Sequence, residues 1–189
     1  HHRVKNNFQI INSLFDLQLM NTESEAVQQS LNEPKARIHA MALIHDRLYH
    51  SGTFSSIDFG DYVSELTRDL FYSYNVDPSR IMLDVDADPV PLDMDRAIPC
   101  GLILNELVTN ALKYAFPDPS GKGVITVTLK KTDSAITLRV KDDGKGLSPD
   151  EAARSRGSLG LTLVRSLCEQ IKGTFELESG PGVTATIRF

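Results

Sequence analysis

The most constraining feature of the chain is a helix that is apolar on most of its sides. The periodicity predicts this helix over residues 96–115, and leucine, isoleucine, valine and alanine dominate its second part. Such a helix must be buried over most of its surface, so it needs other elements packed around it. One polar stripe interrupts it, because Glu106, Asn110 and Lys113 are spaced i, i+4 and i+7 and share a face. This stripe either faces solvent or is buried with partners.

The residues around this helix alternate between strand and helix patterns. Two segments of alternating apolar and polar residues, 124–131 and 135–142, read as strands. Further helices are predicted at 58–74 and 159–172, and further strands at 81–88, 174–178 and 183–189. Helices grouped against a mostly antiparallel sheet form a two-layer α/β sandwich, so the predicted fold class is α+β.

The first 50 residues follow a different pattern, that of a helical hairpin. Each of its two helices has an apolar stripe, the first through Val4, Phe8, Ile11 and Phe15, the second through Val27, Leu31, Ile38, Met41 and Leu48. Pro34 should kink the second helix or mark a late start. A hairpin this small cannot bury both stripes alone. We therefore expect a homodimer through residues 1–50, in which two hairpins form a four-helix bundle.

A short segment between the hairpin and the sandwich reads as a linker. Its sequence, SGTFSS at 51–56, is rich in small and polar residues. The predicted organisation is therefore a helical domain at 1–52 and an α/β domain at 57–189.

Composition excludes several classes of protein. The chain has 189 residues and a formal charge of −5, which argues against a nucleic-acid surface. No apolar run approaches the length that spans a bilayer, so we expect no membrane contact by this chain. Cys100 and Cys168 lie inside apolar helical patterns without metal-type spacing, which favours a reducing, cytoplasmic location.

The polar stripe carries three side chains suited to a magnesium nucleotide. The carbonyl oxygen of Asn110 can ligate Mg²⁺, which prefers oxygen. Lys113 can contact phosphate as a point charge. The carboxylate of Glu106 can take a proton, and it can equally orient a metal-bound water without touching a proton.

A second run, DDGKG at 142–146, follows the strand that ends at Asp142. An aspartate there can accept a hydrogen bond from the amino group of adenine and would reject guanine, which carries a carbonyl at that position. Gly144 and Gly146 let the backbone approach a flat ring closely. Taken alone, the run is also compatible with a simple Asp-Gly turn.

A third run, RGSLGL at 156–161, opens the helix predicted at 159–172 and nominates Gly157, Gly160 and Leu161 as nucleotide contacts. Free backbone N–H groups at a helix start suit a polyphosphate. The glycines can also simply mark the N-terminus of the helix without binding a ligand. Residues 147–156 would form a short, polar, mobile lid. The sequence PSGKG at 119–123 lacks the earlier glycine of a P-loop, so it is interpreted as a loop that enters the strand at Val124.

The order of these three runs resembles the ATP-binding fold shared by DNA gyrase, Hsp90, MutL and histidine kinases. The resemblance covers residues 57–189. It implies ATP and Mg²⁺ as ligands, with Asn110 holding the metal and Asp142 reading adenine. Relatives usually have threonine directly after the glycine of the last motif, whereas Val183 follows Gly182 here and Thr184 comes one place later. That threonine contact is expected to be missing.

The start of the chain, HRVKNN, together with MALIHDRLYHSG at 41–52, resembles the dimerisation and phosphotransfer helices of a histidine-kinase subclass related to the HWE kinases. The resemblance places the phosphoacceptor at His2, directly before Arg3. A neutral imidazole is nucleophilic near physiological pH. His45 lies on the apolar stripe and reads as a core histidine. The two leading histidines would otherwise be the remnant of a purification tag.

These features together predict the catalytic core of a sensor histidine kinase. It would autophosphorylate His2 from ATP and pass the phosphoryl group to an aspartate in the receiver domain of a response regulator. Two alternatives remain open on sequence: a conformational ATPase of the gyrase or Hsp90 type, and a non-catalytic phosphotransfer scaffold.

Overall fold

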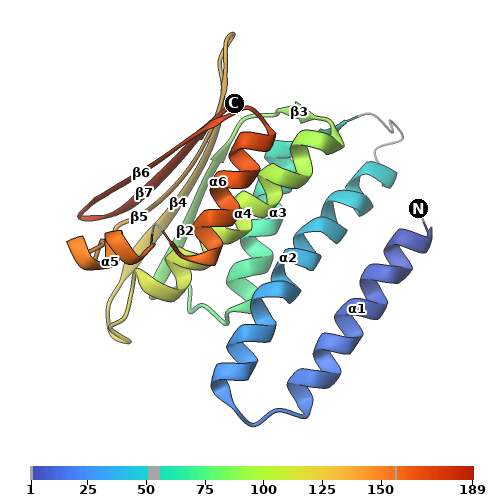
Figure 1. Ribbon diagram of the computed structural model, residues 1–189. Helices are drawn as coiled ribbons and strands as arrows, with labels where there is room; N and C mark the ends of the chain where they lie inside the picture. Colours follow the sequence, from blue (N-terminus) through green and yellow to red (C-terminus); the bar gives the residue numbers. More distant parts are fainter. Residues whose placement is uncertain (1, 51–55, 156) are drawn as a thin grey trace.

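The computed structural model describes residues 2–50, 56–155 and 157–189 (Figure 1). The elements in chain order are α1 (His2–Met20), α2 (Glu25–His50), β1 (Ile57–Asp58), α3 (Phe59–Ser73), β2 (Ile81–Ala87), β3 (Pro91–Leu92), α4 (Met94–Tyr114), β4 (Gly123–Lys131), β5 (Ile136–Asp142), α5 (Pro149–Ser155), α6 (Leu159–Gln170), β6 (Thr174–Gly180) and β7 (Gly182–Arg188).

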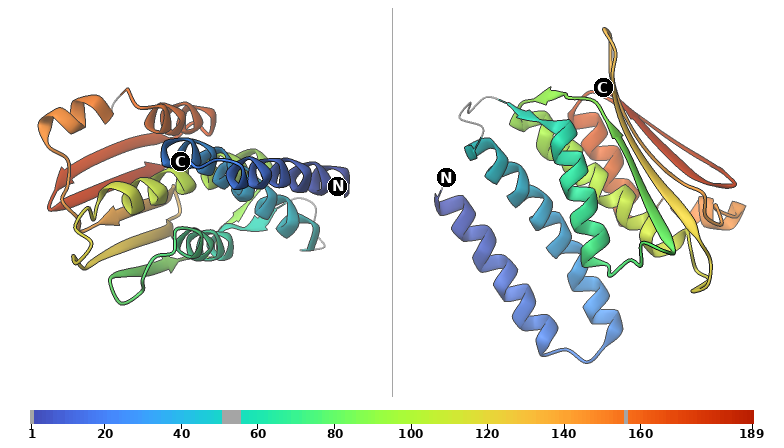
Figure 2. Two further views of the ribbon diagram at one scale, coloured as in Figure 1. Left: turned by 90° about the horizontal axis from the view of Figure 1, so that it is seen from below. Right: turned by 180° about the vertical axis from the view of Figure 1, so that it is seen from behind.

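The larger sheet has the strand order β2-β4-β5-β7-β6. Its β2–β4 pair is parallel, and the remaining pairs are antiparallel. Figure 2 shows α3, α4 and α6 covering one face of this sheet. The predicted α+β class, with a two-layer sandwich and a mostly antiparallel sheet, is confirmed.

The apolar helix predicted at 96–115 is α4, and it is buried as expected. Asp93 caps its start by accepting a hydrogen bond from the N–H of Arg96 at 3.0 Å. Ile103 and Val108 are fully buried. The inward residues of β4 and β5 meet this layer, and Ile125, Val127, Leu129 and Leu138 are likewise fully buried. Period-two burial along these strands follows directly from their alternating sequence.

The helices α1 and α2 form the expected hairpin, and α2 packs along α3 and α4 (Figure 1). Ala40 and Ile44 are fully buried and belong to the same core as the sandwich. The Tyr62 hydroxyl on α3 donates to the carbonyl of Ala40 at 3.1 Å. Gly101 on α4 makes this close approach possible, because a Cβ there would lie 2.9 Å from Ile44 Cδ1. The hairpin and the sandwich are therefore in extensive contact.

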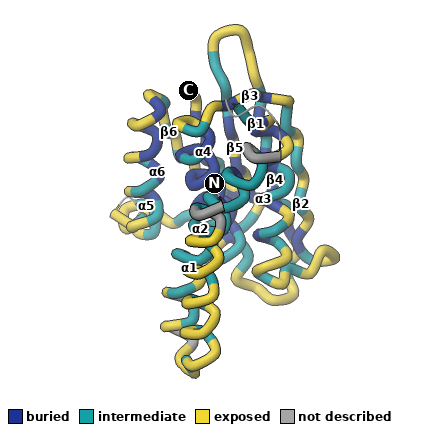
Figure 3. The backbone as a smooth tube through the Cα atoms, turned by 90° about the vertical axis from the view of Figure 1, so that its right-hand side faces the viewer, coloured by how far each residue is buried: buried dark blue, intermediate teal, exposed yellow. Residues whose placement is uncertain are grey.

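The outer helix α1 remains largely uncovered (Figure 3). Five large apolar side chains along it are exposed: Ile10, Ile11, Leu14, Leu17 and Met20. The second helix begins at Glu25, so Pro34 lies inside it rather than at a late start.

Three short elements were not predicted from the sequence. β1 and β3 are two-residue strands that pair with each other, and α5 forms inside the segment expected to be a short, polar, mobile lid. Most of the predicted linker, residues 51–55, lies outside the described residues. Within the part of the chain that the structure describes, no helix is long and apolar enough to cross a membrane.

Candidate functional site

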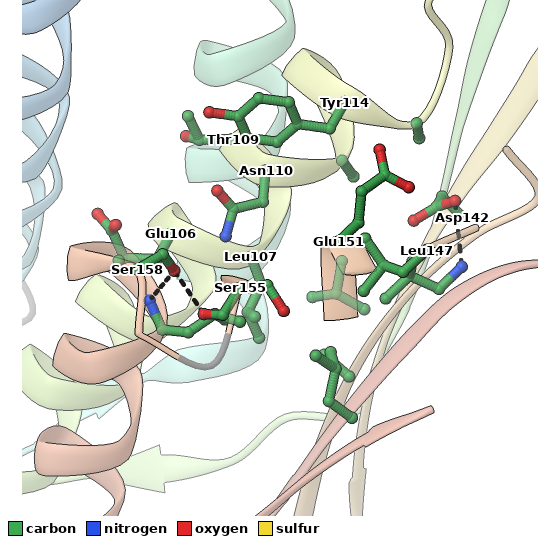
Figure 4. Close-up of a pocket in the computed structure, with 18 of the residues that line it drawn as sticks. Glu106, Leu107, Thr109, Asn110, Tyr114, Asp142, Leu147, Glu151, Ser155 and Ser158 are labelled. Carbon is green, nitrogen blue, oxygen red and sulfur yellow. Dashed lines mark hydrogen bonds between the residues drawn. The ribbon is translucent and has the colours of Figure 1, made fainter. Parts of the chain in front are cut away.

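The three sequence runs meet around one cavity of about 530 Å³. It lies between α4, the ends of β5 and β7, and the segment containing α5 and the start of α6, with Glu33 and Ala36 of α2 at its border. Glu106 and Asn110 project from α4 on one side, and Asp142 lies on the opposite side (Figure 4).

Asp142 lies at the end of the cavity where apolar side chains line the wall. It is 5% exposed, and Val140, Leu177, Val183 and Ala185 line the cavity beside it. Its Oδ1 accepts hydrogen bonds from the backbone N–H groups of Gly144 at 3.0 Å and Val183 at 3.2 Å. Both of these bonds end on Oδ1, so among the described residues Oδ2 is left to accept from a ligand. Burial raises the pKa of the Asp142 carboxyl above its ordinary value.

The strand after Gly182 presents valine rather than threonine to this end of the cavity. Val183 lines the cavity and Thr184 does not, as strand alternation requires. The expectation that the family's threonine contact is missing is thus in line with the geometry.

Glycines let the backbone fold tightly around Asp142. Gly146 lines the cavity with φ of +70°, a conformation that side chains rarely adopt. Gly144 does not line the cavity, but its N–H orients Asp142 as described above. Of the glycines near α6, Gly160 lines the cavity together with Leu161, whereas Gly157 does not.

Asn110 is partly buried and lines the middle of the cavity. The described residues contain no group of three His, Cys, Asp or Glu side chains that could hold a metal ion by themselves. The amide oxygen of Asn110 is the kind of ligand that fits Mg²⁺ arriving with nucleotide phosphates and keeping part of its water shell.

Glu106 is buried at 7% exposure and sits where α2, α4 and α6 meet. Arg37 on α2 donates to both of its oxygens, from Nε to Oε1 at 2.7 Å and from Nη2 to Oε2 at 2.9 Å. Asn105 Nδ2 donates to Oε1 at 3.3 Å. At the start of α6, Gly160 leaves room for the carboxylate, since a Cβ there would lie 2.9 Å from Oε2.

Lys113 shares a face with Glu106, as the spacing predicts, but that face meets α2. Lys113 does not line the cavity, and its Nζ forms an ion pair with Glu33. The sequence reasoning missed both α2 partners, Glu33 and Arg37, because nothing in local periodicity identifies contacts between distant segments.

The segment over the cavity is partly helical. Lys145 and Glu151 both line the cavity, and their side chains form an ion pair at 2.5 Å. The hydrogen bond from the Lys145 ammonium group lowers the pKa of Glu151 to about 2. The link joins α5 to the loop that follows Asp142.

The predicted phosphoacceptor begins α1, and its side chain lies outside the described residues. The hairpin register is fixed by Phe8 against His45, with ring centroids 5.6 Å apart, and by Lys35 against Asp16 at 2.5 Å. At about 1.5 Å per residue, the backbone of His2 lies roughly 21 Å along α1 from Asp16, and thus far from the level of Glu33. Burial lowers the pKa of His45, in keeping with a core histidine.

Comparisons with known proteins match two parts of the chain to family models. Residues 1–74 match the family model described as histidine kinase. Residues 96–189 match the model described as histidine kinase-, DNA gyrase B- and HSP90-like ATPase.

Relatives with assigned names are sensor kinases. The chain is 31% identical over 183 residues to sensor histidine kinase PdtaS of Mycolicibacterium smegmatis, covering 97% of this chain and 35% of that protein. It is 27% identical over 190 residues to blue-light-activated histidine kinase 2 of Erythrobacter litoralis, covering 98% of this chain and 53% of that protein. The chain thus spans about a third to a half of the length of these relatives.

Solved structures show the same fold. The histidine kinase domain of the Erythrobacter litoralis EL346 blue-light-activated kinase superposes with a TM-score of 0.78 at 22% identity, covering 100% of this chain and 92% of that one. A second EL346 structure gives a TM-score of 0.76 at 24% identity, covering 100% of this chain and 56% of that chain. With a hairpin of the histidine kinase type joined to a matching ATP-binding domain, the chain belongs to the histidine kinase family.

Proposed function

We propose that the chain is the catalytic core of a sensor kinase that phosphorylates its own His2 from Mg²⁺-ATP. The observation that carries the proposal is the cavity itself, which brings Glu106, Asn110 and Asp142 together from separate segments of the chain. The family match supports ATP as the nucleotide. The helical hairpin that begins at His2 supplies the acceptor.

In the proposed complex, Oδ2 of Asp142 accepts a hydrogen bond from the amino group of adenine. The phosphates extend toward Asn110 and the start of α6, where Gly160 and Leu161 present backbone to them. Gly144, Gly146 and Gly157 shape the loops on either side. Bound Mg²⁺ would be held by Asn110 and the phosphates, and it would neutralise charge on the transferred group.

The proposed reaction conserves atoms and charge. One imidazole nitrogen of His2 forms a bond to the γ-phosphorus while the bond from that phosphorus to the bridging oxygen breaks, releasing ADP. The proton carried by the other ring nitrogen is removed to the Glu106 carboxylate, which acts as general base. Lys113 would contact phosphate once it is no longer paired with Glu33.

Two partners follow from the family. The phosphoryl group would pass from His2 to an aspartate in the receiver domain of a response regulator. A second copy of the chain would cover the exposed apolar side chains of α1, giving a dimer through residues 1–50.

Incubation with γ-labelled ATP and Mg²⁺ tests the proposal. We expect acid-labile, base-stable label on the protein, mapped to His2 by mass spectrometry. Release of labelled phosphate without labelled protein would instead indicate a conformational ATPase, and neither product would indicate a non-catalytic scaffold.

A further inference from the structure

Two ion pairs join the hairpin to the ATP-binding domain at the groups assigned to phosphoryl transfer. Arg37 binds both oxygens of Glu106, and Glu33, one helical turn earlier on α2, binds Lys113. Along this contact, α2 presents an acidic and then a basic residue, Glu33 and Arg37. On α4 they face a residue of the opposite charge, Lys113 and Glu106 respectively. Because the two contacts alternate in charge, they favour a single register of α2 against α4.

The contact with Arg37 is partly shielded from solvent. The side chains of Arg37 and Glu106 are 19% and 9% exposed. The Glu106 carboxylate raises the pKa of Arg37, so the guanidinium remains charged. Each oxygen of Glu106 thus accepts one hydrogen bond from Arg37, and the guanidinium competes with any other group for this carboxylate. Opening of the ion pair would remove this competition.

The second contact holds Lys113 against Glu33 at the border of the cavity. Its Nζ is bound to Glu33, and the lysine does not line the cavity beside Asn110. One turn further along α2, the buried Ala40 and Ile44 hold the same helix against α3 and α4. The ion pairs thus belong to a continuous interface.

The position of His2 is consistent with an arrangement that does not transfer phosphoryl groups. The cavity opens beside Glu33, whereas the backbone of His2 lies roughly 21 Å further along the hairpin from Asp16, which pairs with Lys35 at that level. Within one chain, the ATP-binding domain must leave this register before its nucleotide can reach His2.

We infer that Glu33 and Arg37 form a resting clasp, in which the phosphotransfer hairpin occupies Glu106 and Lys113 until the ATP-binding domain is released. The inference rests on the proposed function, because it takes Glu106 and Lys113 as transfer groups. In the opposite arrangement, Arg37 would be a positioning residue that holds Glu106 ready for catalysis. The two roles predict rate changes of opposite sign when Arg37 is neutralised.

The test compares the wild-type chain with the double variant Glu33→Gln/Arg37→Gln. Lys35→Gln is the matched control, because Lys35 lies on the same helix but pairs with Asp16 inside the hairpin. Initial labelling by γ-labelled ATP at saturating Mg²⁺-ATP is measured, together with ATP affinity and hydrogen exchange of residues 33–47. Glu33→Gln alone is a milder variant, since the Glu33 side chain is 41% exposed and the Arg37 pair stays intact.

The clasp predicts that the double variant labels roughly threefold to tenfold faster than wild type, the size expected from losing two partly exposed ion pairs. Glu33→Gln should give a smaller increase, and Lys35→Gln none. Exchange in residues 33–47 should rise in the double variant alone, with little change in ATP affinity. Slower or unchanged labelling with unchanged exchange would overturn the clasp. Absence of label in wild type would refute the proposed function, and the exchange data would still decide whether Glu33 and Arg37 hold the two parts together.

Discussion

The backbone N–H of Val183 on β7 donates to Oδ1 of Asp142 at the end of β5, at 3.2 Å. The neighbouring strand therefore holds the carboxylate at the cavity through Oδ1, and no described contact occupies Oδ2. An asparagine could keep both backbone hydrogen bonds through its Oδ1 but would turn an N–H toward the ligand.

We therefore expect Asp142→Asn to weaken ATP binding by roughly 1–3 kcal/mol, because a donor would face the adenine amino group. Asp142→Ala should cost a similar amount through loss of the acceptor. Titration of each variant with ATP and GTP by calorimetry measures both effects. Equal ATP affinity in wild type and either variant would contradict the assignment of Asp142.

The same residue gives a pH-dependent prediction for the ligand-free protein. Burial raises the folded pKa of Asp142, so the stability linked to this group is present below its unfolded pKa of about 3.9 and is lost as the pH rises through the folded value. At pH 7 the ionised form is destabilising, and Asp142→Asn should raise the melting temperature. Its advantage should shrink as the pH is lowered through the folded pKa. Asp84→Asn, at an exposed position on β2, is the control.

For Glu106, substitution by glutamine should separate chemistry from binding. Glu106→Gln keeps the size of the side chain but removes the base, so labelling of His2 should fall roughly 10²–10⁴-fold while ATP affinity holds. The substitution also weakens the contact with Arg37, which by itself would speed the reaction, so a net fall is diagnostic. Single-turnover labelling at saturating ATP is the measurement, and near-normal transfer would exclude the general-base role.

His2→Gln should abolish the acid-labile label without changing ATP affinity, because no described residue of α1 lines the cavity. His39→Gln is the matched control, since His39 contacts Asp69 at 2.9 Å on the opposite side of the hairpin interface from α1. Label at the wild-type rate in His2→Gln would assign the acceptor elsewhere.

The exposed face of α1 predicts the oligomeric state. Leu14 and Leu17 are 57% and 56% exposed, and a second hairpin would cover them. Light scattering should give twice the chain mass of 20.9 kDa for wild type and a single chain mass for Leu14→Glu/Leu17→Glu. Met82→Glu, which changes an exposed apolar side chain on β2 and not on α1, should remain dimeric. A monomeric wild type at high micromolar concentration would contradict the prediction.

The periodic elements of the fold could be predicted from sequence because their burial follows their patterns. The helix predicted at 96–115 and the strand predicted at 135–142 lie close to their predicted limits as α4 and β5. The helix α5 was missed because it is short and polar, although it carried a signal. Ser148 and Glu151 form a reciprocal capping box around Pro149, with hydrogen bonds of 2.9 and 3.2 Å.

The residues of the candidate site on α4 could be predicted from sequence, but their partners on α2 could not. Helical spacing places Glu106 and Lys113 on one face, and this is confirmed, but spacing does not say what packs against that face. The partners Glu33 and Arg37 come from a helix about 70 residues earlier, brought there by the packing of Ala40 and Ile44. Contacts of that range depend on the assembled core rather than on any local pattern.

The fit of Ile44 beside Gly101 has a mechanical consequence. The side chain occupies a notch that exists only because residue 101 lacks a Cβ. Successive residues of a helix point about 100° apart, so a screw motion of α2 by one residue would turn Ile44 out of the notch and bring a different side chain against it. The fit therefore resists sliding of the hairpin along α4, because any such movement must first break this contact.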